Sequence, residues 1–194
     1  FQAEYVNPIK IDYNGYEVYE CPPNGQGIVA LMMLNMLSNI NFTKYDPSDY
    51  RRIHIEAEVS KLAFLHRNKY LGDPKFSDIP VEKMLSKDYG LYLSQKINET
   101  SVLQNLDIRK LENNKDTVYI SIVDDKGNFV SFINSIFHPF GSGKVTENTG
   151  ILLHNRGASF NLDNNHPNFY TASKKPMHTI IPGLLMKNNK PIMP

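Results

Sequence analysis

The sequence has one cysteine and almost no net charge, and each shortage excludes a class of protein. A single cysteine, Cys21, excludes an internal disulfide framework and a cysteine-rich zinc site, and its expected role is that of a small packed apolar side chain. The 21 lysines and arginines nearly balance the 20 aspartates and glutamates, and no basic run is interleaved with aromatic residues. Nucleic acid is therefore not an expected partner.

Long hydrophobic runs are also missing. The longest apolar stretch, Gly27 to Leu37, is well short of the roughly 20 residues that cross a bilayer, so it predicts a buried helix and no membrane span. No signal peptide is visible, but the chain opens on Phe1 rather than methionine, so cytoplasmic and exported locations both stay open. No metal and no organic cofactor is predicted.

The first part of the chain predicts a hairpin followed by helices. With 41% apolar residues, 194 residues are enough for one globular domain with a core. Asn14-Gly15 suits a two-residue hairpin turn, and apolar residues recur at helical spacing further on. The expected elements are a hairpin over Ile9–Glu20, a connector at Cys21–Gly27, a long helix at Arg52–Tyr70, shorter helices at Val81–Leu85 and Lys87–Ile97, and a polar, flexible or exposed segment at Asn98–Asp116.

Two local patterns in this part have ordinary interpretations. His54, Glu56 and Glu58 suggest metal ligands, but their order departs from the two-histidine pattern of zinc peptidases, so solvated helix charges are favoured. Asn41-Phe-Thr43 and Asn98-Glu-Thr100 match the glycosylation pattern, which occurs often by chance, and no secretory context is visible.

The composition changes abruptly at Thr117, where two apolar runs predict a buried hairpin. The runs are Thr117–Asp124 and Asn128–Ile136. If Asp125-Lys126-Gly127 forms a three-residue loop with Gly127 in the left-handed conformation, residues whose numbers add to 252 face one another. Thr117 then lies opposite Ser135 on one face of the sheet. A slip of one residue would send Ser135 to the other face, so the prediction depends on the turn.

A threonine at the start of a strand is by itself most often a good strand former. The surrounding motifs change that interpretation, because in order and spacing they resemble the gamma-glutamyltranspeptidase family across essentially the whole chain. The resemblance rests on Tyr16-Glu-Val-Tyr-Glu-Cys-Pro-Pro-Asn-Gly-Gln-Gly27, His54-Ile-Glu-Ala57 with Arg67 and Tyr70-Leu-Gly-Asp-Pro74, Asp116-Thr-Val-Tyr-Ile-Ser-Ile-Val-Asp-Asp-Lys-Gly-Asn128, Phe140-Gly-Ser-Gly143, Thr149-Gly-Ile-Leu-Leu153 and Pro176-Met-His-Thr-Ile-Ile-Pro182.

The resemblance implies an N-terminal nucleophile hydrolase, an α/β protein built as a four-layer αββα sandwich from one precursor that cuts itself before a threonine. Thr117 occupies the place of that threonine, so Asp116-Thr117 is the expected autocleavage bond. After cleavage the freed α-amine, with a pKa near roughly 8, would serve as general base for the Thr117 hydroxyl. The acyl-enzyme formed from an amide would then pass its acyl group to water or an amine.

The resemblance also assigns roles further along the chain. Ser135 falls where the family carries a second hydroxyl that hydrogen-bonds the nucleophile, in agreement with the hairpin register. Arg156, His178 and Thr179 fall where relatives line the substrate pocket. The alternatives are a surface cation for Arg156 and a packed loop histidine for His178.

Three positions depart from the pattern of true transpeptidases. These enzymes usually follow the nucleophile with threonine and histidine, where this chain has Val118 and Tyr119. They also carry an acidic residue before the phenylalanine that matches Phe160, whereas this chain has Ser159. An α-ammonium buried there would lack its counter-charge, which is costly. The substitutions favour the hydrolase and acylase-like branch over glutathione recognition.

The resemblance further implies that this is part of a longer protein. Residues 1–116 correspond to the late large subunit and residues 117–194 to the start of the small subunit, together one domain. The family's oxyanion-hole glycine pair and carboxylate-binding arginine lie outside these residues. The expected partners are a γ-glutamyl or other acyl amide, water or an amine acceptor, and the rest of the precursor; a homo-oligomer stays open. A family member without turnover that serves as a binding module, and a true transpeptidase, are the alternatives.

Overall fold

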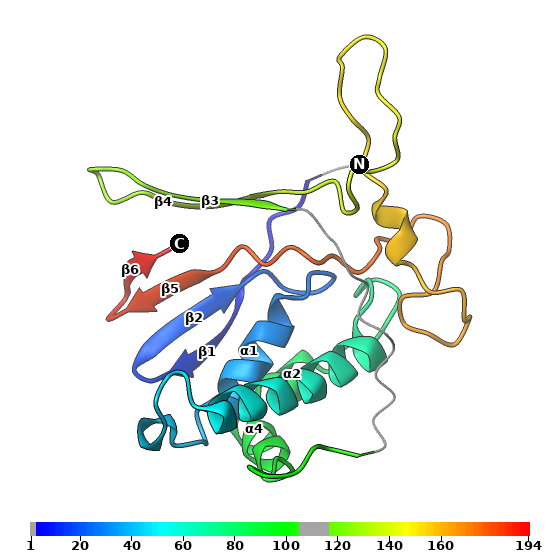
Figure 1. Cartoon of the computed structure of the whole chain (residues 1–194). Helices are drawn as coiled ribbons and strands as arrows, with labels where there is room; N and C mark the ends of the chain where they lie inside the picture. The colour runs from blue at the N-terminus through cyan, green and yellow to red at the C-terminus, as the bar shows by residue number, and fades with distance from the viewer. Residues whose placement is uncertain (1–2, 105–116) are drawn as a thin grey trace.

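The computed structural model describes residues 3–104 and 117–194 and has a mixed helix and sheet fold (Figure 1). The elements in chain order are β1 (Ile9–Tyr13), β2 (Tyr16–Glu20), α1 (Gly27–Leu37), the 3-10 turn η1 (Phe42–Lys44), α2 (Tyr50–Tyr70), α3 (Val81–Leu85), α4 (Lys87–Ser94), β3 (Val118–Val123), β4 (Phe129–Asn134), the 3-10 turn η2 (Arg156–Ser159), β5 (Leu184–Lys187) and β6 (Lys190–Met193).

The first hairpin and the helices follow the sequence pattern closely. Asn14 and Gly15 both have positive φ, as a two-residue hairpin turn requires, and Ile9 pairs with Glu20. Helix α2 starts at Tyr50, two residues before the expected Arg52, because the Asp49 side chain accepts a hydrogen bond from Arg51 N and caps the helix. Helix α4 ends at Ser94, three residues before the expected end.

The core lies among the helices and under one face of the sheet. Helix α1 contacts α2, α3, α4, β1 and β2, so it is the central element of this half. Its residues are apolar on nearly every side, which fits a helix surrounded by other elements. The buried apolar side chains of the cluster are Ile28, Val29, Met32, Met36, Tyr45, Ile55, Val59, Leu62, Ala63, Leu71, Met84 and Leu93.

The four-stranded sheet joins the two ends of the chain. Its order is β1-β2-β5-β6, all antiparallel, so β2 from residues 1–116 pairs directly with β5 from residues 117–194. The pattern analysis missed β5 and β6. Asn188 and Asn189, both at positive φ between the two strands, are the turn signal that would have identified this hairpin.

The second hairpin has the predicted register. Val118 pairs with Asn134 and Val123 with Phe129, Gly127 has φ of +78°, and Asp124 N donates to Asn128 O at 3.1 Å. The turn therefore has the left-handed glycine that the prediction required.

The expected burial of this hairpin is wrong within the described residues. All six residues of β3 are exposed, and β3 and β4 form a two-stranded sheet of their own. Figure 1 shows them beyond the four-stranded sheet, on the side away from α1 and α2. Periodicity predicts which side chains share a face, but it cannot tell what covers that face. Cys21, expected to be packed, is also exposed.

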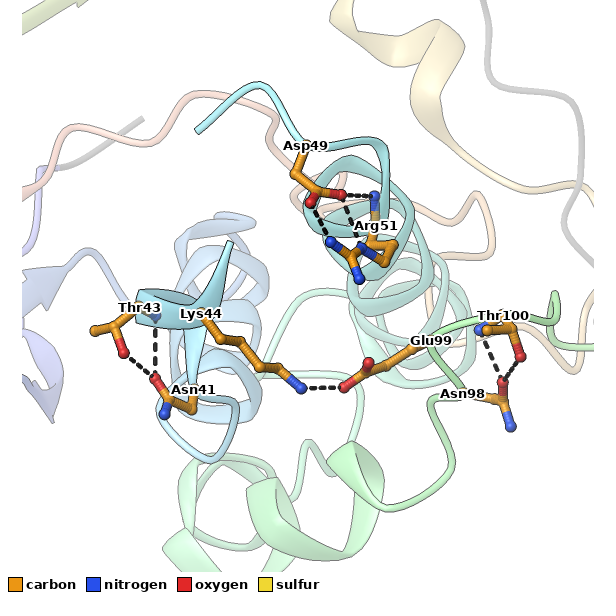
Figure 2. A network of polar contacts seen from close by, with 8 residues as sticks. All are labelled: Asn41, Thr43, Lys44, Asp49, Arg51, Asn98, Glu99 and Thr100. Atoms are coloured by element: carbon orange, nitrogen blue, oxygen red, sulfur yellow. Dashed lines mark hydrogen bonds and ion pairs between the residues drawn. The ribbon is translucent and has the colours of Figure 1, made fainter. Parts of the chain in front are cut away.

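The segment after α4 returns along α2. Lys44 Nζ lies 2.6 Å from Glu99 Oε1. Figure 2 shows this ion pair, with Asn98 turned toward Thr100 in the same manner as Asn41 toward Thr43. His54 Nε2 bonds Asn98 O at 2.9 Å. The exposed strip from Asn98 to Gln104 is thus tied to the helices, and the remainder of the predicted polar segment, residues 105–116, lies outside the described residues.

Candidate active site

Thr117 and Ser135 meet at the open end of the β3–β4 hairpin. Thr117 Oγ1 donates to Ser135 Oγ at 3.2 Å, one step beyond the last ladder pair, Val118 with Asn134. The antiparallel register brings the two hydroxyls together. Thr117 is exposed, so its oxygen is accessible within the described chain. Asp116, the other residue of the expected autocleavage bond, lies outside the described residues.

Arg156 reaches Ser135 from the η2 turn. Asn155 N donates to Ile136 O at 3.2 Å, and Asn155 Oδ1 accepts from His138 N at 3.1 Å, which fixes the start of η2 beside the end of β4. Arg156 Nη2 then donates to Ser135 Oγ at 3.0 Å. Arg156 is 3% exposed, so the surface-cation interpretation is wrong.

Thr179 completes a continuous row of hydrogen-bonded side chains. Arg156 Nη1 donates to Thr179 Oγ1 at 2.5 Å, so one guanidinium links Thr179 to Ser135 and, through it, to Thr117. Four of the five described site residues predicted from the sequence therefore lie in one hydrogen-bonded row. The fifth, His178, neighbours the row without a side-chain hydrogen bond to it; its Nδ1 accepts from Ile180 N at 3.3 Å.

The loop before α1 holds the segment that carries His178 and Thr179. Gln26 N donates to His178 O at 2.8 Å, Gln26 Nε2 donates to Thr179 O at 2.9 Å, and Asn24 Nδ2 donates to Pro176 O at 2.6 Å. Arg67 Nη1 of α2 donates to Gln26 Oε1 at 3.1 Å. Sequence reasoning missed Asn24 and Gln26, although polar amides within a proline- and glycine-rich loop are a signal for backbone docking.

The charges of the row favour a neutral His178 beside a charged Arg156. Burial, together with the nearby Arg156 and His154, lowers the pKa of His178 to about 4. Burial also lowers the pKa of Arg156, but a guanidinium remains protonated at neutral pH. Within residues 3–104 and 117–194, Arg156 has no carboxylate partner; its side-chain hydrogen bonds go to the hydroxyls of Ser135 and Thr179.

Ser159, expected to match the acidic residue of transpeptidases, is turned toward the backbone. Its single hydroxyl proton is shared between two carbonyl oxygens, Arg156 O at 2.9 Å and Met177 O at 3.1 Å from Oγ. The hydroxyl thereby ties η2 to the segment before His178. A neutral hydroxyl in this position supplies no negative charge for a substrate ammonium group.

The alternative metal ligands on α2 are engaged separately. Glu56 pairs with Arg52 at 3.0 Å and Glu58 with Lys61, whereas His54 bonds the Asn98 carbonyl. Across the part of the chain that the structure describes, no three histidine, cysteine or acidic side chains gather as a metal site. In the same described part, every helix is too short or too polar to cross a bilayer.

Comparison with known proteins identifies the family. A family model described as Gamma-glutamyltranspeptidase matches residues 1–194. The chain is 40% identical over 190 residues to the glutathione hydrolase-like YwrD proenzyme of Bacillus subtilis (strain 168), covering 98% of this chain and 35% of that protein. It is 31% identical over 192 residues to the oxamate amidohydrolase proenzyme of Klebsiella pneumoniae, covering 99% and 35%.

A solved structure gives the same result for the fold. The cephalosporin acylase from Bacillus halodurans matches with a TM-score of 0.85 and 41% identity, covering 99% of this chain and 34% of that chain. This chain thus spans about a third of the length of the relatives that it matches.

Proposed function

Because the chain belongs to the gamma-glutamyltranspeptidase family, we propose that it forms part of a self-processed amide hydrolase or acyltransferase with Thr117 as nucleophile. The fold is that of the N-terminal nucleophile hydrolases, as the cephalosporin acylase match shows. Its named relatives are hydrolases, and two are described as proenzymes. The remaining parts of the same precursor are the proposed partners of these 194 residues.

One observation carries the proposal: the Thr117 hydroxyl lies 3.2 Å from Ser135 Oγ at an exposed strand start. The same register follows from the turn at Gly127, independently of the family. An internal threonine lacks an adjacent base, but a threonine that has become an N-terminus carries its own α-amine. Cleavage of Asp116-Thr117 would therefore both expose the nucleophile and create its base.

In the proposed reaction, Thr117 Oγ1 forms a bond to the amide carbonyl carbon while its proton passes to the α-amine. The resulting ammonium then returns a proton to the leaving nitrogen as the carbon–nitrogen bond breaks. Water or an amine takes the acyl group from the threonine ester in a second step. Ser135 is the proposed hydrogen-bonding partner of the nucleophile in both steps.

Arg156, His178 and Thr179 are the proposed border of the acyl pocket. Arg156 contacts Ser135 directly and Thr179 contacts Arg156, while His178 precedes Thr179 in the chain. Burial, with the nearby Arg156 and His154, lowers the pKa of His178 to about 4, so it is neutral at neutral pH. The hydroxyl of Ser159 is bonded to two carbonyls, which supports the hydrolase and acylase-like branch over glutathione recognition. Among the matched relatives, the names oxamate amidohydrolase and cephalosporin acylase belong to that kind of chemistry.

Size and N-terminal sequencing of the full-length protein test the nucleophile. The wild type should run as two pieces, with the smaller one beginning at Thr117, and Thr117→Ala should give one uncut band. A wild type that stays uncut and lacks amidase activity would instead support the non-catalytic binding module.

A second assay separates hydrolysis from transpeptidation. Release of the anilide from a γ-glutamyl anilide should not accelerate when glycylglycine is added, because water is the expected acceptor. A clear acceleration would favour the transpeptidase alternative.

A further inference from the structure

Three hydrogen-bond donors converge on the Ser135 hydroxyl oxygen. Thr117 Oγ1 donates at 3.2 Å, Arg156 Nη2 at 3.0 Å and Phe137 N at 3.2 Å. A hydroxyl oxygen has two lone pairs, so it accommodates two of these donors well. The Arg156 and Phe137 protons are fixed on nitrogen, whereas the Thr117 proton rotates about its carbon–oxygen bond. The Thr117 proton is therefore the one most easily displaced.

This crowding is relieved when Ser135 becomes the donor to Thr117. With both lone pairs of Ser135 occupied by N–H groups, the serine proton is the group left to face Thr117 Oγ1. A hydroxyl that donates to the Thr117 oxygen stabilises the negative charge that develops there as Thr117 loses its proton. The two N–H groups thus favour the arrangement in which Ser135 donates to Thr117 Oγ1, which is the arrangement that an attacking oxygen needs.

The guanidinium that supplies one of these donors is rigidly held. Arg156 is 3% exposed, its Nη1 is anchored on Thr179 Oγ1 at 2.5 Å, and its carbon Cζ lies 4.5 Å from the centre of the Phe137 ring. Thr179 is in turn fixed through its carbonyl by Gln26 Nε2 at 2.9 Å. The charge therefore stays one hydroxyl away from the nucleophile, without a carboxylate among the described residues to neutralise it.

We propose that Arg156 is a positioning residue that holds the Ser135 hydroxyl as donor to Thr117 Oγ1 and so accelerates both self-cleavage and acyl transfer. This inference rests on the proposed function of Thr117. In self-cleavage, Thr117 Oγ1 bonds to the Asp116 carbonyl carbon, the carbon–nitrogen bond breaks, and the hydroxyl proton ends on the Thr117 nitrogen. Water then hydrolyses the resulting ester, which leaves a carboxyl on Asp116 and returns the hydroxyl to Thr117. Arg156 keeps all of its protons throughout.

Self-cleavage separates this role from substrate binding, since it involves no external substrate. The full-length precursor is synthesised in a cell-free system, and the uncut band is followed over time by gel electrophoresis. Arg156→Met should slow self-cleavage by about 10-fold or somewhat more. The effect should be smaller than the roughly 100-fold or greater loss that follows removal of a donor aimed directly at the developing charge. Arg156→Lys, which keeps the charge but not the fork, should fall between Arg156→Met and wild type.

A double variant tests whether Arg156 acts through Ser135. Ser135→Ala combined with Arg156→Met should cleave no more slowly than Ser135→Ala alone, because the guanidinium then has no hydroxyl to orient. In mature Arg156→Lys enzyme, kcat should fall while KM stays near the wild-type value. Multiplicative effects in the double variant would contradict the inference.

Two controls keep the result interpretable. Arg52→Met removes an arginine of α2 whose side chain pairs with Glu56, and should cleave at the wild-type rate. Thr117→Ala with and without Arg156→Met gives uncut proteins whose thermal unfolding shows whether the substitution alters folding; if it does, Arg156→Lys is the deciding variant.

The possible failures are distinguishable. An uncut wild type, or a Thr117→Ala variant that is still cut at this bond, contradicts the proposed function. In a second case the wild type is processed and Thr117→Ala is inert, but Arg156→Met self-cleaves normally and its mature form has a raised KM. This result contradicts only the positioning role and makes Arg156 a substrate contact.

Discussion

The helical half of the molecule and the β3–β4 hairpin both contain runs of apolar residues, but these are buried in the helices and largely exposed in β3. Residues of α1 and α2 such as Met36, Ile55 and Leu62 are buried against one another. Ile120 and Ile122 of β3 are as apolar, yet both are exposed within the described residues. The helical half thus contributes its own core, whereas the hairpin positions Thr117, the proposed nucleophile.

The difference shows that the register of a strand pair and its burial have separate causes. The β3–β4 register follows from its turn and ladder hydrogen bonds, which are local. The pairing of β2 with β5, by contrast, joins residues more than 160 positions apart in the chain. Thr117 and Ser135 could therefore be paired from local sequence, even though the expected cover of their hairpin was wrong.

The largest expected contrast is between Leu62→Ala and Ile122→Ala. Leu62 is 3% exposed, so its truncation should lower the free energy of unfolding by about 2–5 kcal/mol through lost transfer energy and a cavity. Ile122 is 53% exposed, and its truncation should cost less than about 1 kcal/mol. Urea unfolding of the 194-residue chain, followed by circular dichroism, measures both. Equal losses would break the comparison by showing that the hairpin face is covered in solution.

A medium effect is expected from Glu20, a buried carboxyl at the end of β2. It is 7% exposed, its Oε2 has no hydrogen-bond partner among the described residues, and burial raises its pKa to about 7. The folded state therefore binds a proton more tightly than the unfolded state, and stability should fall as the pH rises from about 4.5 to about 7. Glu20→Gln should remove this fall and stabilise the protein by about 1–3 kcal/mol above that range.

Glu58→Gln is the matched control in the same half. Glu58 is 1% exposed; burial opposes its charge, but hydrogen bonds from Lys61 and Leu103 N outweigh burial and lower the pKa of Glu58. Its stabilisation is present above the unfolded pKa and is lost as the pH falls, so Glu58→Gln should destabilise the protein near neutral pH. Urea unfolding at pH values below and above the Glu20 transition tests both, and equal signs for the two variants would refute the assignment.

The smallest expected contrast uses one serine from each region. Ser86 Oγ accepts from Tyr89 N at 3.2 Å and caps α4, so Ser86→Ala should cost about 1 kcal/mol. Ser131 Oγ shares a hydrogen bond with Tyr119 OH on the exposed hairpin, and Ser131→Ala should change stability by less than about 0.5 kcal/mol. Thermal unfolding midpoints rank the pair, and a larger loss at Ser131 would mean that the hairpin contributes more to stability than its exposure indicates.

Much of the helical half was predictable because its signals are local. Asn14-Gly15 gave the first hairpin turn, and apolar spacing gave α2 to within two residues at its start. The strands β5 and β6 were missed because short runs flanked by prolines resemble a loop, although Asn188 and Asn189 marked their turn. The three-residue difference at the end of α4 reflects the weak sequence specification of helix ends.

The candidate site, too, has features that follow from local sequence and features that depend on tertiary packing. The sequence by itself determined that Thr117 faces Ser135, because a glycine turn and a period of two residues define an antiparallel register. Only the tertiary structure decided that Arg156 is buried between Ser135 and Thr179, that Gln26 supports Thr179 from the loop before α1, and that Ser159 faces backbone carbonyls. These contacts join residues far apart in the chain, and their side-chain directions depend on packing, for which no local pattern exists.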